Sequence, residues 1–309
     1  MTQERSFRAH GVNVKPANHQ RPQGWFLAAA GMLLVSTDSI FVRWADTDAW
    51  TIAFLVGVCG VVTQGLGLRF HERLALRKLI VGSGRPLWVV GVLGALTQLA
   101  FIASITFTEI ANAVAIVGAM PLMAAMAAFV VLGERPGVRV MFAITVTIIG
   151  VLIIVAGSIR GPNLVGDLLA VGAIIGFSGV IVTWRQHPDL SRFGGLALSS
   201  AIMAAVSLPL VNWAAIPGRT LVACLGMGLI FNPLGRLLHS TAPRYASSAE
   251  VALFTPTETV AATLWAVIFF QEWPSWQTFA GGLTIVIGVF VGTVGELLNR
   301  QDAHSVPST

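Results

Sequence analysis

The chain has 309 residues, of which 55% are hydrophobic and only 11% are charged, and its net charge is +5 at pH 7. Soluble domains carry about 25% charged residues, so a soluble core could not bury this much apolar surface. The composition therefore excludes an ordinary soluble domain and predicts an integral membrane protein. We interpret the net positive charge as a sign of membrane topology rather than of nucleic-acid binding.

Residues 1–24 are polar and contain no apolar h-region, so we expect a cytoplasmic tail followed by an uncleaved membrane anchor. Ten apolar runs follow, each close to the roughly 20 residues that a helix needs to cross a bilayer. These predicted spans lie near residues 25–44, 50–69, 86–106, 109–132, 138–158, 165–184, 194–213, 219–239, 245–270 and 275–296.

Basic residues alternate between the connecting segments. If residues 1–24 are cytoplasmic, all of the 19 Lys and Arg residues except Arg43, Arg160 and Arg219 fall on the cytoplasmic side. Cytoplasmic loops carry this excess of basic residues. Tryptophans, which favour the headgroup level, fall at the proposed helix ends, and Trp265 alone lies clearly within a span. The sequence therefore predicts ten crossings of the inner (plasma) membrane with both termini in the cytoplasm.

The two halves of the chain share a motif. Gly133-Glu134-Arg135-Pro136 closes the fourth predicted span, and Gln271-Glu272-Trp273-Pro274 closes the ninth. Each half then has five spans, and an odd number inverts the second half relative to the first. We predict an all-α integral membrane fold of ten transmembrane helices in two inverted five-helix repeats. The repeats cover residues 25–158 and 165–297, and residues 298–309 form a second cytoplasmic tail.

The same motif carries a family resemblance. The fourth span, from Asn112-Ala113-Val114-Ala115 to its closing motif, and the ninth, with Glu258 and Leu264-Trp265, resemble EamA-type members of the drug/metabolite transporter superfamily. The resemblance covers about residues 25–297. Thr259 stands where the family usually has proline, and Pro256 comes earlier instead. The resemblance implies ten helices, a central cavity between the halves, and transport, commonly efflux, of a small metabolite or drug-like compound.

Charged residues within spans cost about 2.5–3.5 kcal/mol each on insertion scales, so each needs a reason. Glu258, near the middle of the ninth span, is the leading candidate for a cavity-facing carboxylate that contacts a substrate amine or exchanges a proton; the alternative is a helix–helix hydrogen bond. Arg236, in the eighth span, would hold a substrate carboxylate, reach the inner headgroups, or pair with Glu250. If Arg236 and Glu258 both face the cavity, a zwitterion such as an amino acid becomes an attractive substrate.

Five further polar residues are candidates for substrate contact. Asp38 lies in the outer half of the first span, five residues before Arg43, where an intrahelical or interhelical pair is the alternative role. Gln98 in the third span must find a partner for its amide, in a substrate or on a neighbouring helix. Asn112 opens the fourth span and would otherwise cap it. The remaining two are Asn232 in the eighth span and Trp184, which either lines the cavity or belongs to the interfacial aromatic belt.

Prolines interrupt three predicted spans. Pro121 and Pro256 lie in the fourth and ninth spans, and Pro233 lies in the eighth. Proline removes a backbone donor and clashes with the preceding turn. We expect the fourth and ninth helices to bend around the substrate pathway, a static packing kink being the alternative. Glu134 and Glu272 are more consistent with shaping turns than with touching substrate.

These observations favour a secondary transporter of small amphipathic metabolites, such as amino acids, organic cations or drug-like compounds, which acts by alternating access, with export inferred from the resemblance. Protons are a candidate coupling ion, the partners are the substrate and the bilayer, and the chain would be a monomer or a homodimer. We expect no nucleotide cofactor or metal, because the sequence has neither a P-loop nor a metal-ligand motif. Alternatives are an intramembrane enzyme acting on lipid and a non-transporting scaffold.

Overall fold

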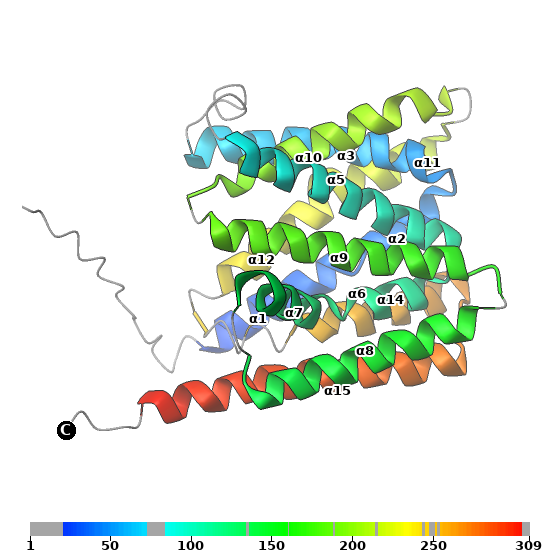
Figure 1. Cartoon of the computed structure of the whole chain (residues 1–309). Coiled ribbons are helices and arrows are strands. Elements are labelled where there is room, and N and C mark those ends of the chain that lie inside the picture. Colours follow the sequence, from blue (N-terminus) through cyan, green and yellow to red (C-terminus); the bar gives the residue numbers. More distant parts are fainter. Residues whose placement is uncertain are drawn as a thin grey trace, which may run out of the picture.

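The computed structural model describes residues 21–72, 84–133, 136–159, 161–187, 189–213, 216–242, 245–246, 251 and 254–304. Every regular element in these residues is a helix, and the helices run roughly side by side (Figure 1). The first half contains α1 (Arg21–Val35), α2 (Asp38–Ala45), α3 (Ala49–Gly67), the π-helix η2 (Leu68–Glu72), α5 (Gly84–Phe107), α6 (Ile110–Val117), α7 (Met120–Leu132) and α8 (Val138–Ser158). The second half contains α9 (Leu164–Gln186), α10 (Arg192–Ser207), the 3₁₀ turn η3 (Leu208–Leu210), α11 (Gly218–Leu225), the π-helix η5 (Gly226–Phe231), α12 (Asn232–Thr241), α14 (Thr255–Phe270) and α15 (Trp276–His304).

Seven helical segments of the described residues are long and apolar enough to cross a membrane, or eight if the bent pair α6–α7 is one span. The seven are Pro22–Ala45, Ala49–Phe70, Gly84–Phe107, Val138–Ser158, Leu164–Gln186, Arg192–Leu210 and Gly218–His239. The two remaining predicted spans correspond to α14, which has 16 residues, and to the apolar stretch Trp276–Gly292 of α15. Residues 247–250 and 252–253, at the start of the predicted ninth span, lie outside the described residues. The all-helical membrane fold is confirmed, and the count of ten crossings stays a prediction.

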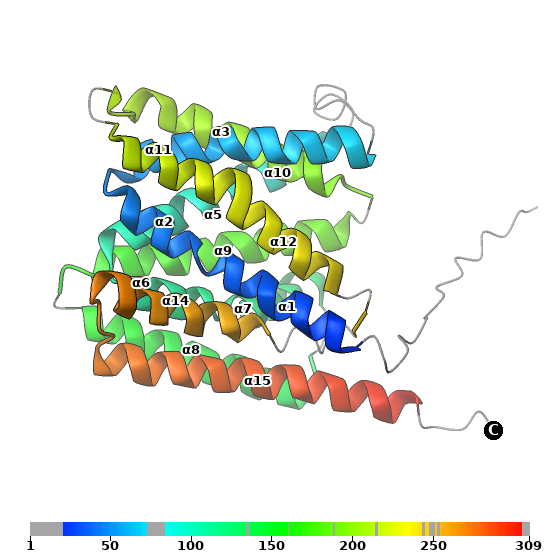
Figure 2. The ribbon, with the colours of Figure 1, turned by 180° about the vertical axis from the view of Figure 1, so that it is seen from behind.

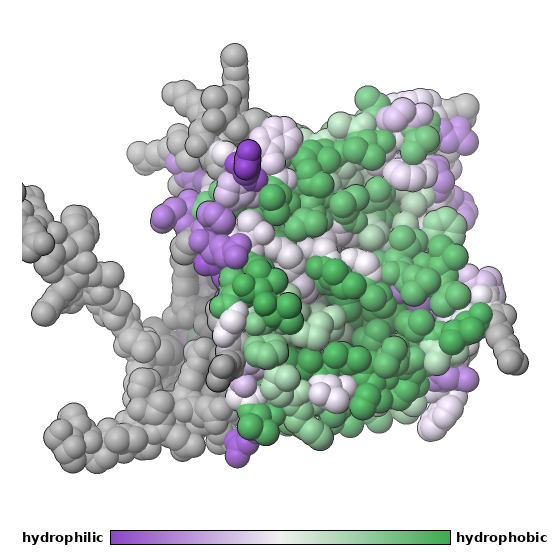
Figure 3. All heavy atoms as spheres, viewed as in Figure 1, coloured by the Kyte–Doolittle hydropathy of each residue, from purple (hydrophilic) through white to green (hydrophobic). Residues whose placement is uncertain are grey.

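The helices end in two opposite layers of loops, which orient the molecule. We call the layer where α1 begins the α1 end, on the left of Figure 1, and the layer where α2 ends the α2 end. The start of α1 and the end of α15 lie in the same layer in both views (Figures 1 and 2). On the face seen in Figure 3, the surface between the layers is a broad apolar band, and hydrophilic residues gather toward its two edges. Large exposed side chains such as Phe26, Val130 and Phe142 contribute apolar surface that lipid, not water, would cover.

Helices from the two halves interlock rather than form separate domains. α8 packs along α15, α5 along α9, α3 along α10, and α1 along α12. Small residues permit these close approaches, as is usual between helices in membranes. At the α8–α15 crossing, a Cβ atom added to Gly150 would lie 2.7 Å from the carbonyl oxygen of Gly281.

Helices break near the middle of the bundle. α1 ends at Val35 and α2 begins at Asp38, and the Ser36 and Thr37 hydroxyls between them donate to the carbonyls of Leu33 and Leu34 at 2.7 and 2.6 Å. Such bonds compete with the helical ladder and often bend helices. α6 and α7 meet at an angle of 40°.

The three predicted kink prolines each open a new helical segment. Pro121 is the second residue of α7, Pro233 is the second residue of α12 after the π-helix η5, and Pro256 is the second residue of α14. Proline is tolerated in a first turn because its missing N–H would have no intrahelical partner there. The bend of the fourth span therefore lies just before Pro121, and the gating role of these residues stays a prediction. Thr259, the departure from the family pattern, donates to the carbonyl of Val114 in α6 at 3.2 Å.

Candidate functional site

A cluster of polar side chains surrounds the break between α1 and α2; we call Ser36, Asp38, Asn232, Arg236, Glu258 and Trp265 the central cluster. Asp38 is the first residue of α2 and is only 6% exposed. Its Oδ2 accepts a hydrogen bond from Asn232, the first residue of α12. Its Oδ1 is buried and has no hydrogen-bond partner among the described residues. Asp38 therefore keeps one acceptor available for a donor from outside the chain.

Arg236 orients this contact and adds charge. Its Nε donates to Asn232 Oδ1 at 2.9 Å, so the amide of Asn232 joins the guanidinium to the carboxyl of Asp38. Glu258, in the first turn of α14, is half-buried, and both Arg236 and Glu258 act electrostatically on Asp38. With all three groups ionised, the cluster has one more negative than positive charge. It is therefore suited to receive a cation.

Trp265 and Ser36 connect α14 to the same break. Trp265 Nε1 donates to Ser36 Oγ at 2.9 Å, and the Trp265 ring contacts Phe269. The one tryptophan that the sequence placed within a span thus belongs to the central cluster. Glu250, the predicted alternative partner of Arg236, lies outside the described residues.

Gln98 and Trp184 join other helices. Gln98 Nε2 on α5 donates to Ser199 Oγ on α10 at 2.9 Å. Trp184 lies in the last turn of α9, where the Arg192 guanidinium carbon is 6.0 Å from its ring centroid. Gln98 and Trp184 each have one such contact within the chain, and the contact of each with a substrate stays a prediction.

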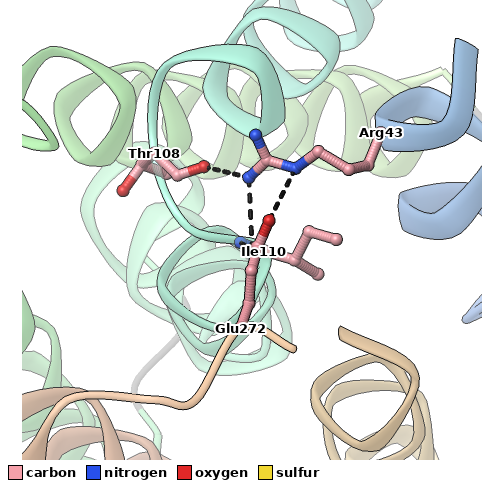
Figure 4. Close-up of polar contacts among 4 residues, drawn as sticks. All are labelled: Arg43, Thr108, Ile110 and Glu272. Atoms are coloured by element: carbon pink, nitrogen blue, oxygen red, sulfur yellow. Dashed lines mark hydrogen bonds and ion pairs between the residues drawn. The ribbon is translucent and has the colours of Figure 1, made fainter. Parts of the chain in front are cut away.

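A second set of polar contacts lies at the α2 end. Arg43 of α2 and Glu272, which follows α14, form an ion pair with 3.0 Å between Arg43 Nε and Glu272 Oε1 (Figure 4). An Arg43 Nη atom donates to the Thr108 carbonyl at 2.7 Å, and the Ile110 backbone N–H donates to Glu272 Oε2 at 3.0 Å (Figure 4). Arg43 thus pairs with Glu272, and Asp38 contacts Asn232 of α12, which is the interhelical rather than the intrahelical form of the predicted alternative for Asp38.

Asp167 connects the halves beside this ion pair. It lies in the first turn of α9 with 0% exposure, and its Oδ1 accepts from Thr108 Oγ1 at 2.7 Å. Asn112 Nδ2 donates to both Asp167 oxygens at 3.2 Å and to Ser158 Oγ at 3.3 Å. Thr278 of α15 donates to Asn112 Oδ1. Asn112 is therefore held by other side chains of the protein. It does not cap the helix, because the N-cap residue of α6 is Glu109.

Sequence reasoning missed Asp167, although it is an acidic residue inside a predicted span and the rule that selected Glu258 would have found it. Glu272 lies in a turn, where Gln271 before it is left-handed and the Glu272 N–H donates to the Ala266 carbonyl at 3.2 Å, while its side chain pairs with Arg43. Its counterpart Glu134 lies outside the described residues. Cys59 and Cys224 are free and buried.

Glu109 lies between α5 and α6, outside the membrane-spanning helices. Burial raises the pKa of its carboxyl above the ordinary value, and the negative charge of Glu272 raises this pKa further. A hydrogen bond with Asn163 and the charge of Arg43 act in the opposite direction, while Asp167 adds to the increase. Glu109 therefore holds its proton to a higher pH in the folded chain than in the unfolded chain.

This gives a stability prediction. The pKa of Glu109 is higher in the folded chain than in the unfolded chain, so binding of a proton to this carboxyl stabilises the fold at low pH. This contribution to the free energy of unfolding is lost as the pH rises through the folded-state pKa. Glu109→Gln should therefore be slightly more stable than the parent above this pKa and equal to it in acid. Thermal unfolding in detergent over a pH series measures the difference, with Glu72→Gln at the α1 end as the matched control. Parallel curves for parent and Glu109→Gln would contradict the prediction.

Apolar helices that are interrupted around buried charges are typical of polytopic membrane transporters. The sequence matches the model of the EamA-like transporter family twice, over residues 22–156 and 164–294, and the chain belongs to that family. One solved structure, titled only as the crystal structure of a protein, has a TM-score of 0.60 and 19% sequence identity to this chain. The match covers 89% of this chain and 98% of the other, and it supports the fold alone. No curated protein matches.

Proposed function

We propose that the chain is a secondary transporter that binds small amphipathic metabolites with a cationic amine at the central cluster. The observation that carries this proposal is Asp38 Oδ1, which is buried and without a partner among the described residues. A buried acceptor left unsatisfied costs about 1–3 kcal/mol, and more when charged. A substrate ammonium group, or a proton in its absence, would supply the donor.

Arg236 and Glu258 extend the substrate class. Arg236 is exposed although it lies on Gly218–His239, a segment able to cross a membrane, and Glu258 is half-buried on α14, the helix that corresponds to the predicted ninth span. Charged side chains at this depth usually face a bundle interior or a water-filled cavity rather than lipid. Arg236 would hold the carboxylate of an amino acid, while an organic cation would use Asp38 and Glu258 alone. Exchange of the bound amine for a proton at these carboxyls would couple transport to a proton gradient.

The helix packing supports ten crossings in two inverted repeats. In two repeats of five spans, the first span (α1 and α2) corresponds to α9, and the third span (α5) corresponds to the eighth (α11 and α12). Exchanging the two halves therefore converts the contact between α1 and α12 into the contact between α9 and α5. The same exchange maps the α3–α10 and α8–α15 pairs onto themselves. Such a pseudo-two-fold arrangement is the usual basis of alternating access.

The basic residues support an orientation in the inner membrane with the α1 end in the cytoplasm. Arg69, Arg85, Arg139, Arg185 and Arg192 all lie on helix ends or links of this layer. Cytoplasmic loops carry such an excess. Export as the direction of transport follows from the family resemblance.

Counterflow tests this function directly. The purified chain is placed in proteoliposomes loaded with an unlabelled compound, and uptake of the same labelled compound is followed for a panel of amino acids, nucleosides and amines. We expect saturable uptake of an amine-bearing compound without ATP, and reduced uptake with Glu258→Gln. Arg236→Gln should reduce uptake of amino acids more than that of organic cations. Liposomes without protein are the control, and a chemically altered product or unchanged uptake in both variants would contradict the proposal.

A further inference from the structure

The ion pair at the α2 end joins three segments that are far apart in the sequence. Arg43 lies near the end of α2, Glu272 lies between α14 and α15, and Thr108 and Ile110 flank the link between α5 and α6. The pair has two close approaches, 3.0 Å from Arg43 Nε to Glu272 Oε1 and 3.3 Å from an Arg43 Nη to Oε2 (Figure 4). Each partner also binds the α5–α6 link, through the Thr108 carbonyl and the Ile110 N–H.

An apolar seal lies among the same elements. Val42 and Ala45 of α2 belong to one buried cluster with Ile110 and Ala113 of α6 and Ala266 of α14. Ala45, Ile110, Ala113 and Ala266 are each 0% exposed. The contact between α2 and α6 is therefore closed to water at this end.

α2 is bounded by an irregularity on each side, which lets it move as a short rigid piece. The Ser36–Thr37 break precedes it, and Asp46 after it has a left-handed backbone with φ of 47°. A few residues at element ends commonly act as such hinges. The end of α2 is also tied to α11, since Thr220 Oγ1 donates to the Ala45 carbonyl at 2.8 Å and Arg219 pairs with Asp46.

These contacts divide the α2 end into two groups: α2 with α11 on one side, and the α5–α6 link with the α14–α15 link on the other. Arg43 reaches from the first group to the second. A half-buried pair, with side-chain exposures of 27% and 22%, can be released to water without leaving a charge stranded in the core.

We propose that the Arg43–Glu272 contact is a releasable lock that holds the α2 end of the passage closed in this conformation. Breaking it lets α2 and α11 part from α6 and α14 and exposes the apolar seal. The same helix carries Asp38 at its other end, so opening moves a residue of the central cluster. This meaning for transport rests on the proposed function, whereas the lock itself is testable without any substrate.

The test is the reactivity of a cysteine placed in the seal. Ala113→Cys is introduced into the full chain in lipid nanodiscs, and its reaction with a membrane-impermeant maleimide is timed. We expect slow reaction in the parent, and reaction faster by roughly tenfold with Arg43→Gln or Glu272→Gln, since coupling of this kind is typically 5–150-fold. Arg43→Lys, which keeps the charge, should stay close to the parent.

Controls separate release of the lock from damage to the fold. Arg219→Gln breaks an ion pair within one group and should leave the reaction rate unchanged. The chain without the introduced cysteine gives the background from Cys59 and Cys224, which are buried. The double variant Arg43→Gln/Glu272→Gln should react no faster than Arg43→Gln alone, because Arg43→Gln already removes the contacts that Arg43 makes with both Glu272 and Thr108. Unchanged reactivity in single variants that keep the parental thermal midpoint would overturn the lock, and because no substrate is added, that outcome is independent of a failed counterflow assay.

Discussion

Asp38→Asn should reduce counterflow of an amine-bearing substrate by at least about a hundredfold while the chain still folds. Asparagine keeps the shape of the side chain and an oxygen that accepts from Asn232, but it removes the charge that would meet a substrate ammonium group or a proton. Removing one partner of a buried charge pair costs about 3–5 kcal/mol. Since 1.4 kcal/mol is tenfold in affinity, the expected loss exceeds a hundredfold.

Asp46→Asn is the matched control for this variant. It makes the same chemical change immediately after the other end of α2, where Asp46 pairs with Arg219 and its side chain is 68% exposed. Exposed ion pairs contribute about 0–1 kcal/mol, so this variant should transport as the parent does. Normal counterflow by a folded Asp38→Asn chain would show that Asp38 has no direct role in substrate binding.

The sequence predicted the class of fold because a membrane span needs only a run of apolar residues. The helices that satisfy this requirement lie close to their predicted positions, from Pro22–Ala45 to Gly218–His239. The breaks within spans were harder to predict. Ser36 and Thr37 satisfy backbone carbonyls with their own hydroxyls, and the π-helix η5 leaves no compositional signal. A continuous apolar run therefore concealed the break in the first span and the π-helix in the eighth, although Pro233 had indicated an interruption of the eighth span.

The partners of the charged side chains were less predictable than the positions of the helices. Asp38 and Arg43 are five residues apart, a spacing that does not bring side chains together on one helix face, where pairs lie three or four residues apart. Asp38 instead meets Asn232 from a distant part of the chain, and Arg43 meets Glu272. Such contacts depend on how helices pack, which no local pattern encodes.

Replacing Asp167 with Leu should destabilise the folded chain by about 2–6 kcal/mol. Asp167 has 0% exposure and accepts hydrogen bonds from Thr108 Oγ1 and Asn112 Nδ2. Leucine removes both acceptors, so the Thr108 hydroxyl and one N–H of the Asn112 amide lose their partner, at about 1–3 kcal/mol each, while the other amide N–H keeps Ser158 Oγ. Unfolding in a denaturing detergent titration, followed by circular dichroism, measures the loss.

Two further variants locate the cause in hydrogen bonding. Asp167→Asn keeps one acceptor and the side-chain volume, and its amide can donate to the Thr108 hydroxyl, so its loss of stability should fall between those of the parent and Asp167→Leu. Leu168→Ala changes the adjacent residue of α9, which is 53% exposed, and should have little effect. Because Asn112 also binds Ser158 of α8 and Thr278 of α15, the loss at Asp167 should spread to contacts between α6 and both of these helices. An Asp167→Leu chain as stable as the parent would mean that these donors find other partners, and that the polar network does not hold the halves together.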